Sequence, residues 1–259
     1  MSDQDDAKQM VDEFAARTSG SLWIHINRAD VAAGLKERID DPDKIDQADC
    51  NLCGPADYCW DLASDKPKLY AQLGIDLYEK ASALIGSLKV KPTKDLLNHY
   101  LPSTSTINAA DWVTMASIRD SDNWIIDFQS ESDAAAGITM PHSLTSWFKD
   151  TGYTKVVNDT NVYFSKNLAC AKEASRLRGD GYRVCLFINA NMIDVKTQDD
   201  SSTTPDHWVM LTSAMTITGT TSIKFRIYTW GSERDVPSSG TLTVAHFLDN
   251  FYGYVAAKF

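Results

Sequence analysis

The 259-residue sequence predicts an α+β fold, with helices in the first half of the chain and an antiparallel sheet in the second. Apolar residues in the first half recur at helical spacing, as in DQDDAKQMVDEFAART near its start. The second half holds runs rich in β-branched and aromatic residues, separated by turn signals. We expect two lobes of one domain, a helical lobe over about 1–125 and a β lobe over about 137–259, divided within residues 120–137.

The first half predicts four elements after the initial helix. SLWIHIN, residues 21–27, alternates like a short strand, and a helix is expected from Pro55 to about Leu62. PKLYAQLGIDLYEKASALIGSL, residues 67–88, reads as one long amphipathic helix. Asn108 is predicted to cap the helix that opens NAADWVTMASIRD.

The second half predicts helices first and then strands. Pro141 and Gly152 bracket one helix, and SKNLACAKEASRLRGDG, residues 165–181, forms another that a glycine closes. The predicted strands are YRVCLFINA, HWVMLTSAMTI, SIKFRIYTWG and the closing YGYVAAK, with a short helix LTVAHFLDNF before the last.

Charge and composition exclude several classes of partner. The net charge is −10 with no compensating basic block, which argues against a nucleic-acid or anionic-membrane partner. No run of 18 apolar residues predicts a membrane span, and the acidic start lacks the pattern of a secretory signal. We expect a protein made in the cytoplasm without a signal peptide. Five cysteines cannot form a complete disulfide framework.

The segment QADCNLCGPADYCWDLA, residues 47–63, holds three of the five cysteines. Cys50 and Cys53 have the spacing of half a zinc ribbon, but the other half is missing. A thioredoxin-type motif would follow a strand, and DDPDKIDQAD before Cys50 is not one. The sequence therefore predicts neither a metal site nor a cofactor.

The remaining interpretation makes Cys53 a nucleophile in the first turn of a helix. The partial positive charge of a helix N-terminus lowers a thiol pKa, and the thiolate is the reactive form. Gly54 would let a substrate backbone pass close by, and Pro55 suits a first turn. Cys59 is expected in the core and Cys50 in a loop.

These residues resemble the papain-like cysteine peptidases and amidases. Gln47 precedes Cys53 by six residues, Cys50 falls on the non-catalytic cysteine of the pattern Q-x-x-C-x-x-C, and CGPA is a bacterial variant. The resemblance implies a papain-like fold, in which the helix of the nucleophile packs on the C-terminal sheet. It also implies that the Gln47 amide donates to the oxyanion.

The general base is predicted to be His207, which opens the apolar run HWVMLTS directly after a polar loop. The other candidates, His25, His99, His142 and His246, stand in less suitable contexts. The family places Asn or Asp at the end of the next strand, where this sequence has Tyr228 and Thr229.

Thr229 is our first candidate for the residue that orients the histidine ring. Its Oγ1 could accept from the ring N–H, while Asp206, Glu233 or Asp235 could substitute from nearby loops. A Cys–His dyad without a third member is the remaining alternative.

The sequence thus predicts a cysteine-dependent hydrolase of amide bonds, either a peptidase or a peptidoglycan amidase. Trp208, Trp230 and Gly54 are the candidate substrate-binding residues. The resemblance extends to secreted bacterial effector toxins, which implies export by a dedicated secretion system and a cognate immunity protein. A deamidase or transglutaminase, or a non-catalytic papain-like interaction module, is the alternative.

Overall fold

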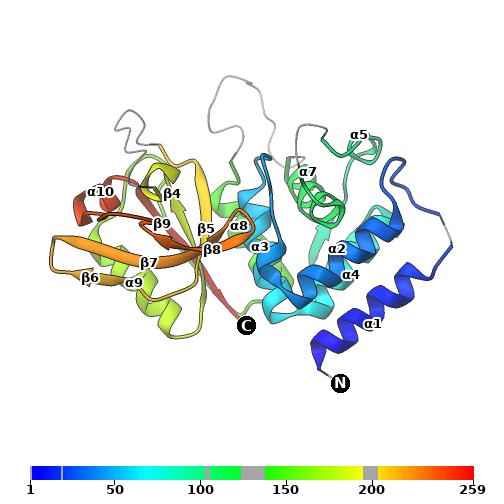
Figure 1. The fold of residues 1–259 in the computed structure, drawn as a ribbon, viewed down its shortest axis with the longest axis horizontal. Helices are drawn as coiled ribbons and strands as arrows, with labels where there is room; N and C mark the ends of the chain where they lie inside the picture. The colour runs from blue at the N-terminus through cyan, green and yellow to red at the C-terminus, as the bar shows by residue number, and fades with distance from the viewer. Residues whose placement is uncertain (1, 19, 103–105, 124–137, 195–203) are drawn as a thin grey trace. The chain divides into compact units, whose positions relative to one another are not determined.

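The computed structural model describes all residues except 1, 19, 103–105, 124–137 and 195–203 (Figure 1). The chain divides into two compact units, Met1–Thr139 and Met140–Phe259. Most of the predicted division, residues 124–137, lies outside the described residues. Unit 1 is mainly helical and unit 2 is built on an antiparallel sheet, which confirms the α+β class.

Unit 1 contains helices joined to one small hairpin. Its described elements are α1 Asp3–Ala15, α2 Arg28–Asp40, η1 Pro42–Lys44, α3 Cys53–Asp65, α4 Pro67–Lys80, β1 Ala83–Ile85, β2 Leu88–Val90, α5 Lys94–Leu97, α6 Ala109–Asp111, the π-helical η2 Trp112–Ala116 and α7 Ser117–Asn123. Helices α1, α2 and α4 pack on one another, and α3 packs on α4. Phe14 of α1 meets Tyr78 of α4 edge to face, at 5.4 Å between ring centroids.

The predicted strand over residues 21–27 is wrong. These residues form bends without a strand partner, and the ring of Trp23 is buried with its Nε1 donating to the Leu77 carbonyl at 3.0 Å. Alternating hydrophobicity here reflects side chains that anchor a loop on α4, because a strand also needs a neighbour for its backbone groups.

The long helix predicted over residues 67–88 is shorter than expected. It ends at Lys80, because Ala81 adopts the left-handed conformation with φ of 48°. The chain then turns into the β1–β2 hairpin. The prediction was too long because the apolar residues at every second position of this hairpin also fit a helical pattern over so short a segment.

Two predicted helix starts are confirmed, because capping depends on residues close in sequence. The Asn108 side chain accepts from the backbone N–H of Ala110 at 2.8 Å and begins α6. Pro141 occupies the first turn of α8, and Gly152 ends it with φ of 109°.

Unit 2 combines one large sheet with three α-helices and one short 3₁₀ helix among its described residues. Its elements are α8 Pro141–Thr151, β3 Lys155–Thr160, α9 Leu168–Gly179, β4 Arg183–Ile188, η4 Ala190–Met192, β5 His207–Leu211, β6 Thr216–Thr218, β7 Ser222–Thr229, β8 Ser232–Val236, α10 Val244–Asp249 and β9 Phe251–Lys258. The predicted strands over YRVCLFINA, SIKFRIYTWG and YGYVAAK are present, but HWVMLTSAMTI is not one strand: it divides into β5 and β6, both of which pair with β7. Strands β3 and β8 were not predicted. The strands run antiparallel in the order β3-β9-β4-β5-β7-β6, and β8 also pairs with β7.

The core of unit 2 forms where α9 and α10 cover the sheet. Alternate residues of each strand point into it, as period-two patterning requires. Its members include Ala171, Ala174 and Leu177 of α9, Phe247 of α10, and Val184, Leu186, Val209, Leu211, Phe225, Ile227 and Phe251 of the sheet. His207 and Thr229 share the alternation of these strands, which brings both side chains to one face of the sheet.

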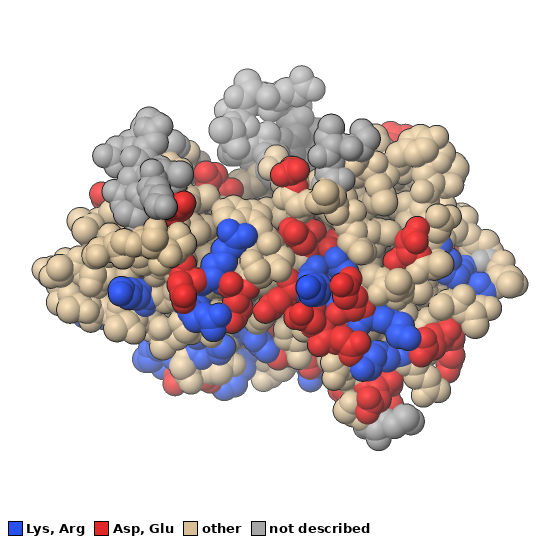
Figure 2. Space-filling model, viewed as in Figure 1, with Lys and Arg blue, Asp and Glu red and all other residues tan. Residues whose placement is uncertain are grey.

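The surface of unit 1 carries both signs of charge. Figure 2 shows Lys and Arg intermingled with Asp and Glu over the helices, and ion pairs Lys8–Asp40 and Lys36–Asp12 join α2 to α1. Such exposed pairs contribute only about 0–1 kcal/mol each. Among the described helices, none combines the length and apolar character needed to cross a bilayer.

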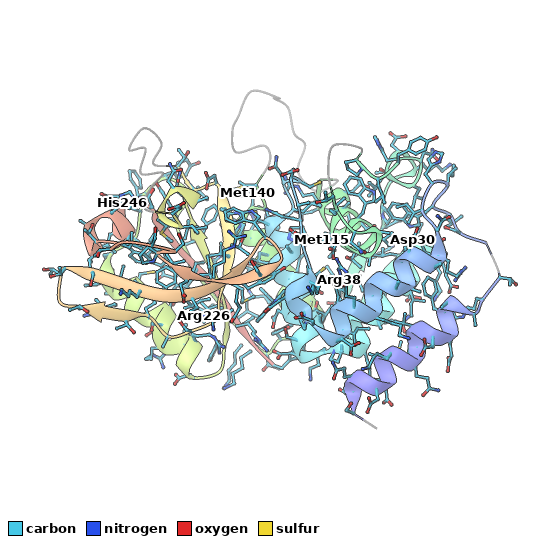
Figure 3. All side chains as sticks on the ribbon, in the orientation of Figure 1. Asp30, Arg38, Met115, Met140, Arg226 and His246 are labelled. Atoms are coloured by element: carbon cyan, nitrogen blue, oxygen red, sulfur yellow. The ribbon has the colours of Figure 1, made fainter. Side chains whose placement is uncertain are left out.

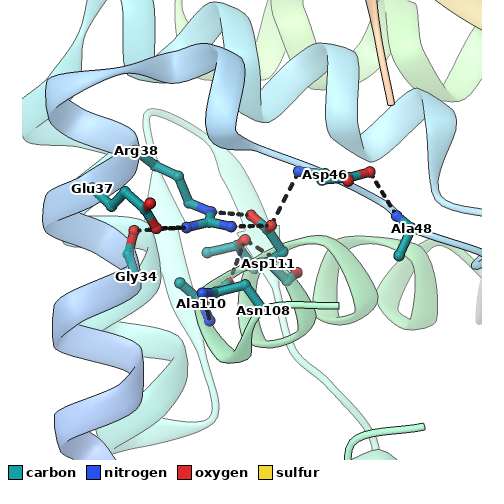
Figure 4. Close-up of polar contacts among 9 residues, drawn as sticks. Gly34, Glu37, Arg38, Asp46, Ala48, Asn108, Ala110 and Asp111 are labelled. Carbon is teal, nitrogen blue, oxygen red and sulfur yellow. Dashed lines mark hydrogen bonds and ion pairs between the residues drawn. The ribbon is translucent and has the colours of Figure 1, made fainter. Parts of the chain in front are cut away.

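One ion pair in unit 1 is buried. Arg38, labelled in Figure 3, donates from Nε and Nη2 to both carboxylate oxygens of Asp111 at 2.7 Å (Figure 4). Arg38 is 4% exposed and Asp111 is fully buried. Burial raises the pKa of Asp111 to about 6 while the Arg38 guanidinium opposes the rise, so the pair is ionised at neutral pH.

We expect Asp111→Asn to destabilise unit 1 by about 3–5 kcal/mol, because it leaves the Arg38 charge buried without a counter-ion. Chemical denaturation measures the free energy of unfolding. Lys8→Ala is the matched control, since it breaks an exposed pair and should cost no more than about 1 kcal/mol. Equal losses in the two variants would contradict a structural role for the buried pair.

Candidate functional site

Cys53 is the first residue of α3 and lies in unit 1, as predicted. Its side chain is largely buried, with 6% of the residue exposed. Leu52 is the cap residue and provides no side-chain cap, and the helix ladder begins with Ala56 N–H donating to the Leu52 carbonyl at 2.8 Å. The thiol therefore stands at the positive end of the α3 dipole, which favours a thiolate.

The loop before Cys53 holds Gln47 in a defined orientation. Gln47 is 8% exposed, and its side chain accepts from the Leu52 N–H at 3.1 Å. Because a backbone N–H only donates, the accepting atom is Oε1, and the Nε2 amide is the group left to donate elsewhere. The geometry fits a side chain that offers a hydrogen bond beside Cys53.

Asp111 also anchors the loop that contains Gln47. Its Oδ2 accepts from the Asp46 N–H at 3.0 Å, and Asp46 Oδ1 accepts from the Ala48 N–H at 2.8 Å (Figure 4). Ala48 has φ of 50°, so the chain reverses direction directly after Gln47. The buried ion pair thus fixes the residues on both sides of Gln47.

Gly54 has a packing role in the structure. A Cβ at this position would come within 2.4 Å of Thr139 Oγ1 and 2.5 Å of Thr139 Cβ. The first turn of α3 therefore tolerates only glycine where Thr139 approaches it. The space we predicted for a substrate backbone is filled by Thr139 on the side where a Cβ would point.

In unit 2, His207 begins β5 and Thr229 ends β7. His207 Nε2 lies 2.7 Å from Thr229 Oγ1, and both residues are buried. The predicted contact between this ring and Thr229 is confirmed. With Nε2 engaged by Thr229, Nδ1 is the ring atom left to exchange a proton with a reactant.

Trp230 and Gly231 form the two-residue turn between β7 and β8, closed by the pair Thr229 and Ser232. Both have positive φ, 47° and 69°, as the preferred two-residue hairpin turn requires. Glycine adopts this conformation freely, whereas for a bulky residue it costs about 1–2 kcal/mol. The cost is offset by what the turn positions, because the Trp230 ring stacks on His207 at 4.7 Å and 15°.

Arg234 makes a cation–π contact with Trp230, the ring that stacks on His207. Its guanidinium lies 5.0 Å from the centroid of Trp230, on β8. Burial lowers the pKa of His207 to about 4, and the positive charge of Arg234 adds to the effect. The imidazole is therefore neutral at pH 7.

The three carboxylates considered as substitutes for Thr229 are engaged elsewhere. Asp206 Oδ1 accepts from the Ala190 N–H at 2.8 Å. Glu233 and Asp235 both pair with Arg226 of β7, which is labelled in Figure 3, at 2.7 and 3.5 Å. Thr229 is thus the partner that the structure gives to Nε2 of His207.

The two tryptophans predicted to bind substrate differ. Trp208 has no exposed surface, and its ring stacks on Phe187 at 4.4 Å, so its proposed contact with a substrate has no support in the structure. Trp230 is partly exposed and holds the catalytic candidate His207 from one side. Its substrate-binding role stays a prediction.

Two of the other cysteines, Cys59 and Cys170, are poor nucleophiles. Burial raises the pKa of Cys59 far above its usual range and that of Cys170 to about 12. All five cysteines are free thiols. Within the described parts of the chain, no group of three or more His, Cys, Asp or Glu side chains could hold a metal ion.

Sequence reasoning missed Arg234 and the anchor formed by Arg38 and Asp111. The alternation of β8 could have placed Arg234 near the histidine, but SERDV carries no strand signature of its own. Arg38 and Asp111 are separated by 73 residues, and no local pattern links them.

Comparisons of the chain with protein-family models, curated proteins and solved structures give no significant match. The function is therefore argued from the geometry of the chain itself.

We expect acidification to destabilise unit 2 through His207. The ring titrates near pH 6.5 when unfolded and near pH 4 when folded, so the unfolded state binds more protons between these values. Stability present above pH 6.5 is lost as the pH falls through this window, by roughly 3 kcal/mol in total. Urea denaturation across the pH range measures the loss.

His207→Gln is the control for this titration, because it removes the ionisable ring and retains a polar side chain. The variant should lose less stability than the parent between pH 7 and pH 4. Parallel curves for the two proteins would show that His207 keeps an ordinary pKa in the fold.

Proposed function

We propose that this protein is a papain-like cysteine hydrolase of amide bonds, with Cys53 as nucleophile, His207 as general base and acid, and Gln47 as oxyanion donor. The observation that carries the proposal is the loop of unit 1. There the Gln47 Oε1 binds the N–H of Leu52, so a side-chain amide donor is held beside the residue that begins α3. Acyl transfer needs both groups at one carbonyl carbon.

The proposed reaction uses the neutral imidazole of His207. Its Nδ1 accepts the proton of the Cys53 thiol as sulfur attacks the carbonyl carbon, and the C=O electron pair becomes the oxyanion. The protonated ring then donates to the leaving amine as the C–N bond breaks. In the second half, water attacks the acyl carbon and gives a proton to Nδ1, and the ring returns that proton to sulfur as the C–S bond breaks, which regenerates the thiol and the neutral imidazole.

Thr229 orients the ring through both steps. The proposed tautomer carries its proton on Nε2, which lies 2.7 Å from Thr229 Oγ1, so the ring donates to Thr229 whether Nδ1 is empty or protonated. A hydroxyl provides direction but no negative charge, and the low pKa of His207 is consistent with that. The site therefore favours a proton transfer concerted with attack over a resting thiolate–imidazolium pair.

The proposal also includes the kind of bacterial protein this chain is and the way it leaves the cell. Its resemblance to bacterial effectors supports a toxin exported by a dedicated secretion system and neutralised by an immunity protein, with peptide or peptidoglycan as substrate. A deamidase or transglutaminase would use the same three residues with a different acceptor. A non-catalytic module would use the same fold without the thiol.

The function is tested by incubating the purified chain with a peptide library and with peptidoglycan fragments, beside Cys53→Ser. A hydrolase splits an amide bond with addition of one water, a deamidase converts an amide to an acid without splitting the chain, and a transglutaminase joins an added amine. Mass spectrometry distinguishes these products. Cys53→Ser should lose at least about 10³-fold in rate, since a hydroxyl is a far weaker nucleophile.

Expression of both proteins in the bacterial cytoplasm and periplasm gives a second readout. Toxicity in one compartment that requires Cys53 would identify where the substrate lies. Equal toxicity of the parent chain and Cys53→Ser would favour the non-catalytic module and contradict the proposal.

We expect Gln47→Glu to lower turnover by about 10²–10³-fold, the loss typical of one oxyanion donor. Glutamate keeps an acceptor oxygen for the Leu52 N–H, so the loop should stay anchored while the amide donor is removed. Gln47→Ala removes both interactions and should lose at least as much. Full activity of Gln47→Glu would exclude this side chain from the oxyanion site.

A further inference from the structure

Unit 1 contains a pocket of about 330 Å³ next to the start of α3. The loop before Cys53 forms one wall, and the π-helical segment with α7 forms the other. Six of its lining residues are Cys50, Leu52, Trp112, Ala116, Arg119 and Asp120. The volume is within the range of small-ligand pockets.

Arg119 places a cation in this pocket. The side chain is partly buried, and its Nη1 donates to the Ile138 carbonyl at 3.3 Å. Burial lowers the pKa of Arg119, while the negative charge of Asp122, and that of Cys53 when its thiol is ionised, oppose the change. Arg119 is thus close enough to Cys53 for their charges to interact.

The other residues that line the pocket determine which ligand groups would fit beside Arg119. Leu52, Ala116 and the ring of Trp112 provide apolar surface, and π-helical turns such as η2 frequently occur at functional sites. Asp120 is held by the Thr93 N–H, which donates to its Oδ2 at 2.5 Å. The negative charge of Asp120 in the pocket disfavours ligands that carry more than one negative charge.

We propose that this pocket binds a single carboxylate of the substrate, with Arg119 as its partner and the apolar walls around the attached carbon chain. The planar guanidinium matches a carboxylate in two parallel hydrogen bonds. The inference rests on the proposed function, since it gives the substrate of Cys53 an acidic group near the bond that is cleaved.

Iodoacetate and iodoacetamide test the pocket without knowledge of the substrate. In both, the Cys53 sulfur attacks the methylene carbon, an S–C bond forms, iodide leaves with the bonding pair and the thiol proton passes to solvent. The reagents differ only in carrying a carboxylate or a neutral amide. Their rate ratio at Cys53, compared with the ratio for free cysteine, measures carboxylate recognition.

We expect the ratio to favour iodoacetate at Cys53 by roughly tenfold or more over free cysteine, as a charge-assisted hydrogen bond would give. Arg119→Gln should abolish this preference and Arg119→Lys should keep part of it. Arg17→Gln removes an equal charge from an exposed site of the same unit and should leave the preference intact. Peptide mass spectrometry separates Cys53 from Cys50, which shares the pocket.

A ratio like that of free cysteine in the parent chain, or one unchanged in Arg119→Gln, would overturn the proposal. If circular dichroism shows that Arg119→Gln does not fold, the pocket is tested instead by how well carboxylate ligands protect Cys53 of the parent chain from alkylation. N-acetylglutamate should then slow alkylation by iodoacetamide more than N-acetylglutamine does, and equal protection would contradict the pocket. Alkylation of Cys53 does not depend on hydrolysis of an amide bond. A protein that hydrolyses no substrate but still prefers iodoacetate at Cys53 would therefore contradict the proposed function and leave the pocket proposal standing.

Discussion

The buried pair of Arg38 and Asp111 is the interaction on which the candidate site of unit 1 depends. Two charges taken out of water are costly, and the cost is offset here because both carboxylate oxygens receive guanidinium donors. The same carboxylate also accepts the backbone N–H of Asp46. The ion pair between α2 and α6 in the core therefore determines the path of the loop that runs from Gln47 to Cys53.

In unit 2, the side chain of His207 is held in place by a backbone conformation and not by an ion pair. The two-residue turn after β7 forces positive φ on Trp230, and the flat ring then lies against His207. Asparagine or glycine would adopt that conformation at lower cost. A bulky residue in the left-handed region is a local penalty that the surrounding strand pairing must hold in place, as residues at functional sites often require.

Local features could be predicted from the sequence more fully than contacts between distant residues. Asn108 and Pro141 marked their helices correctly because a cap or a first-turn proline acts over a few residues. Residues 21–27 misled because alternation cannot reveal whether a strand has a neighbour. Thr229 was found beside His207 through strand order, whereas the contact of Trp230 with Arg234 depends on a turn conformation that tryptophan rarely adopts.

The neutral partner of His207 sets the kind of catalysis these residues could perform. A carboxylate would stabilise the imidazolium and favour a resting ion pair with a thiolate. Threonine only orients the ring, and Arg234 disfavours its protonation further, so the base stays neutral until a proton is offered. Activation of the thiol must then come from its own surroundings at the start of α3, where the helix dipole and the nearby Arg119 both favour negative charge. In the proposed mechanism, burial and the Arg234 charge would keep the imidazole of His207 unprotonated down to about pH 4, and the reactivity of Cys53 would depend on its surroundings in unit 1.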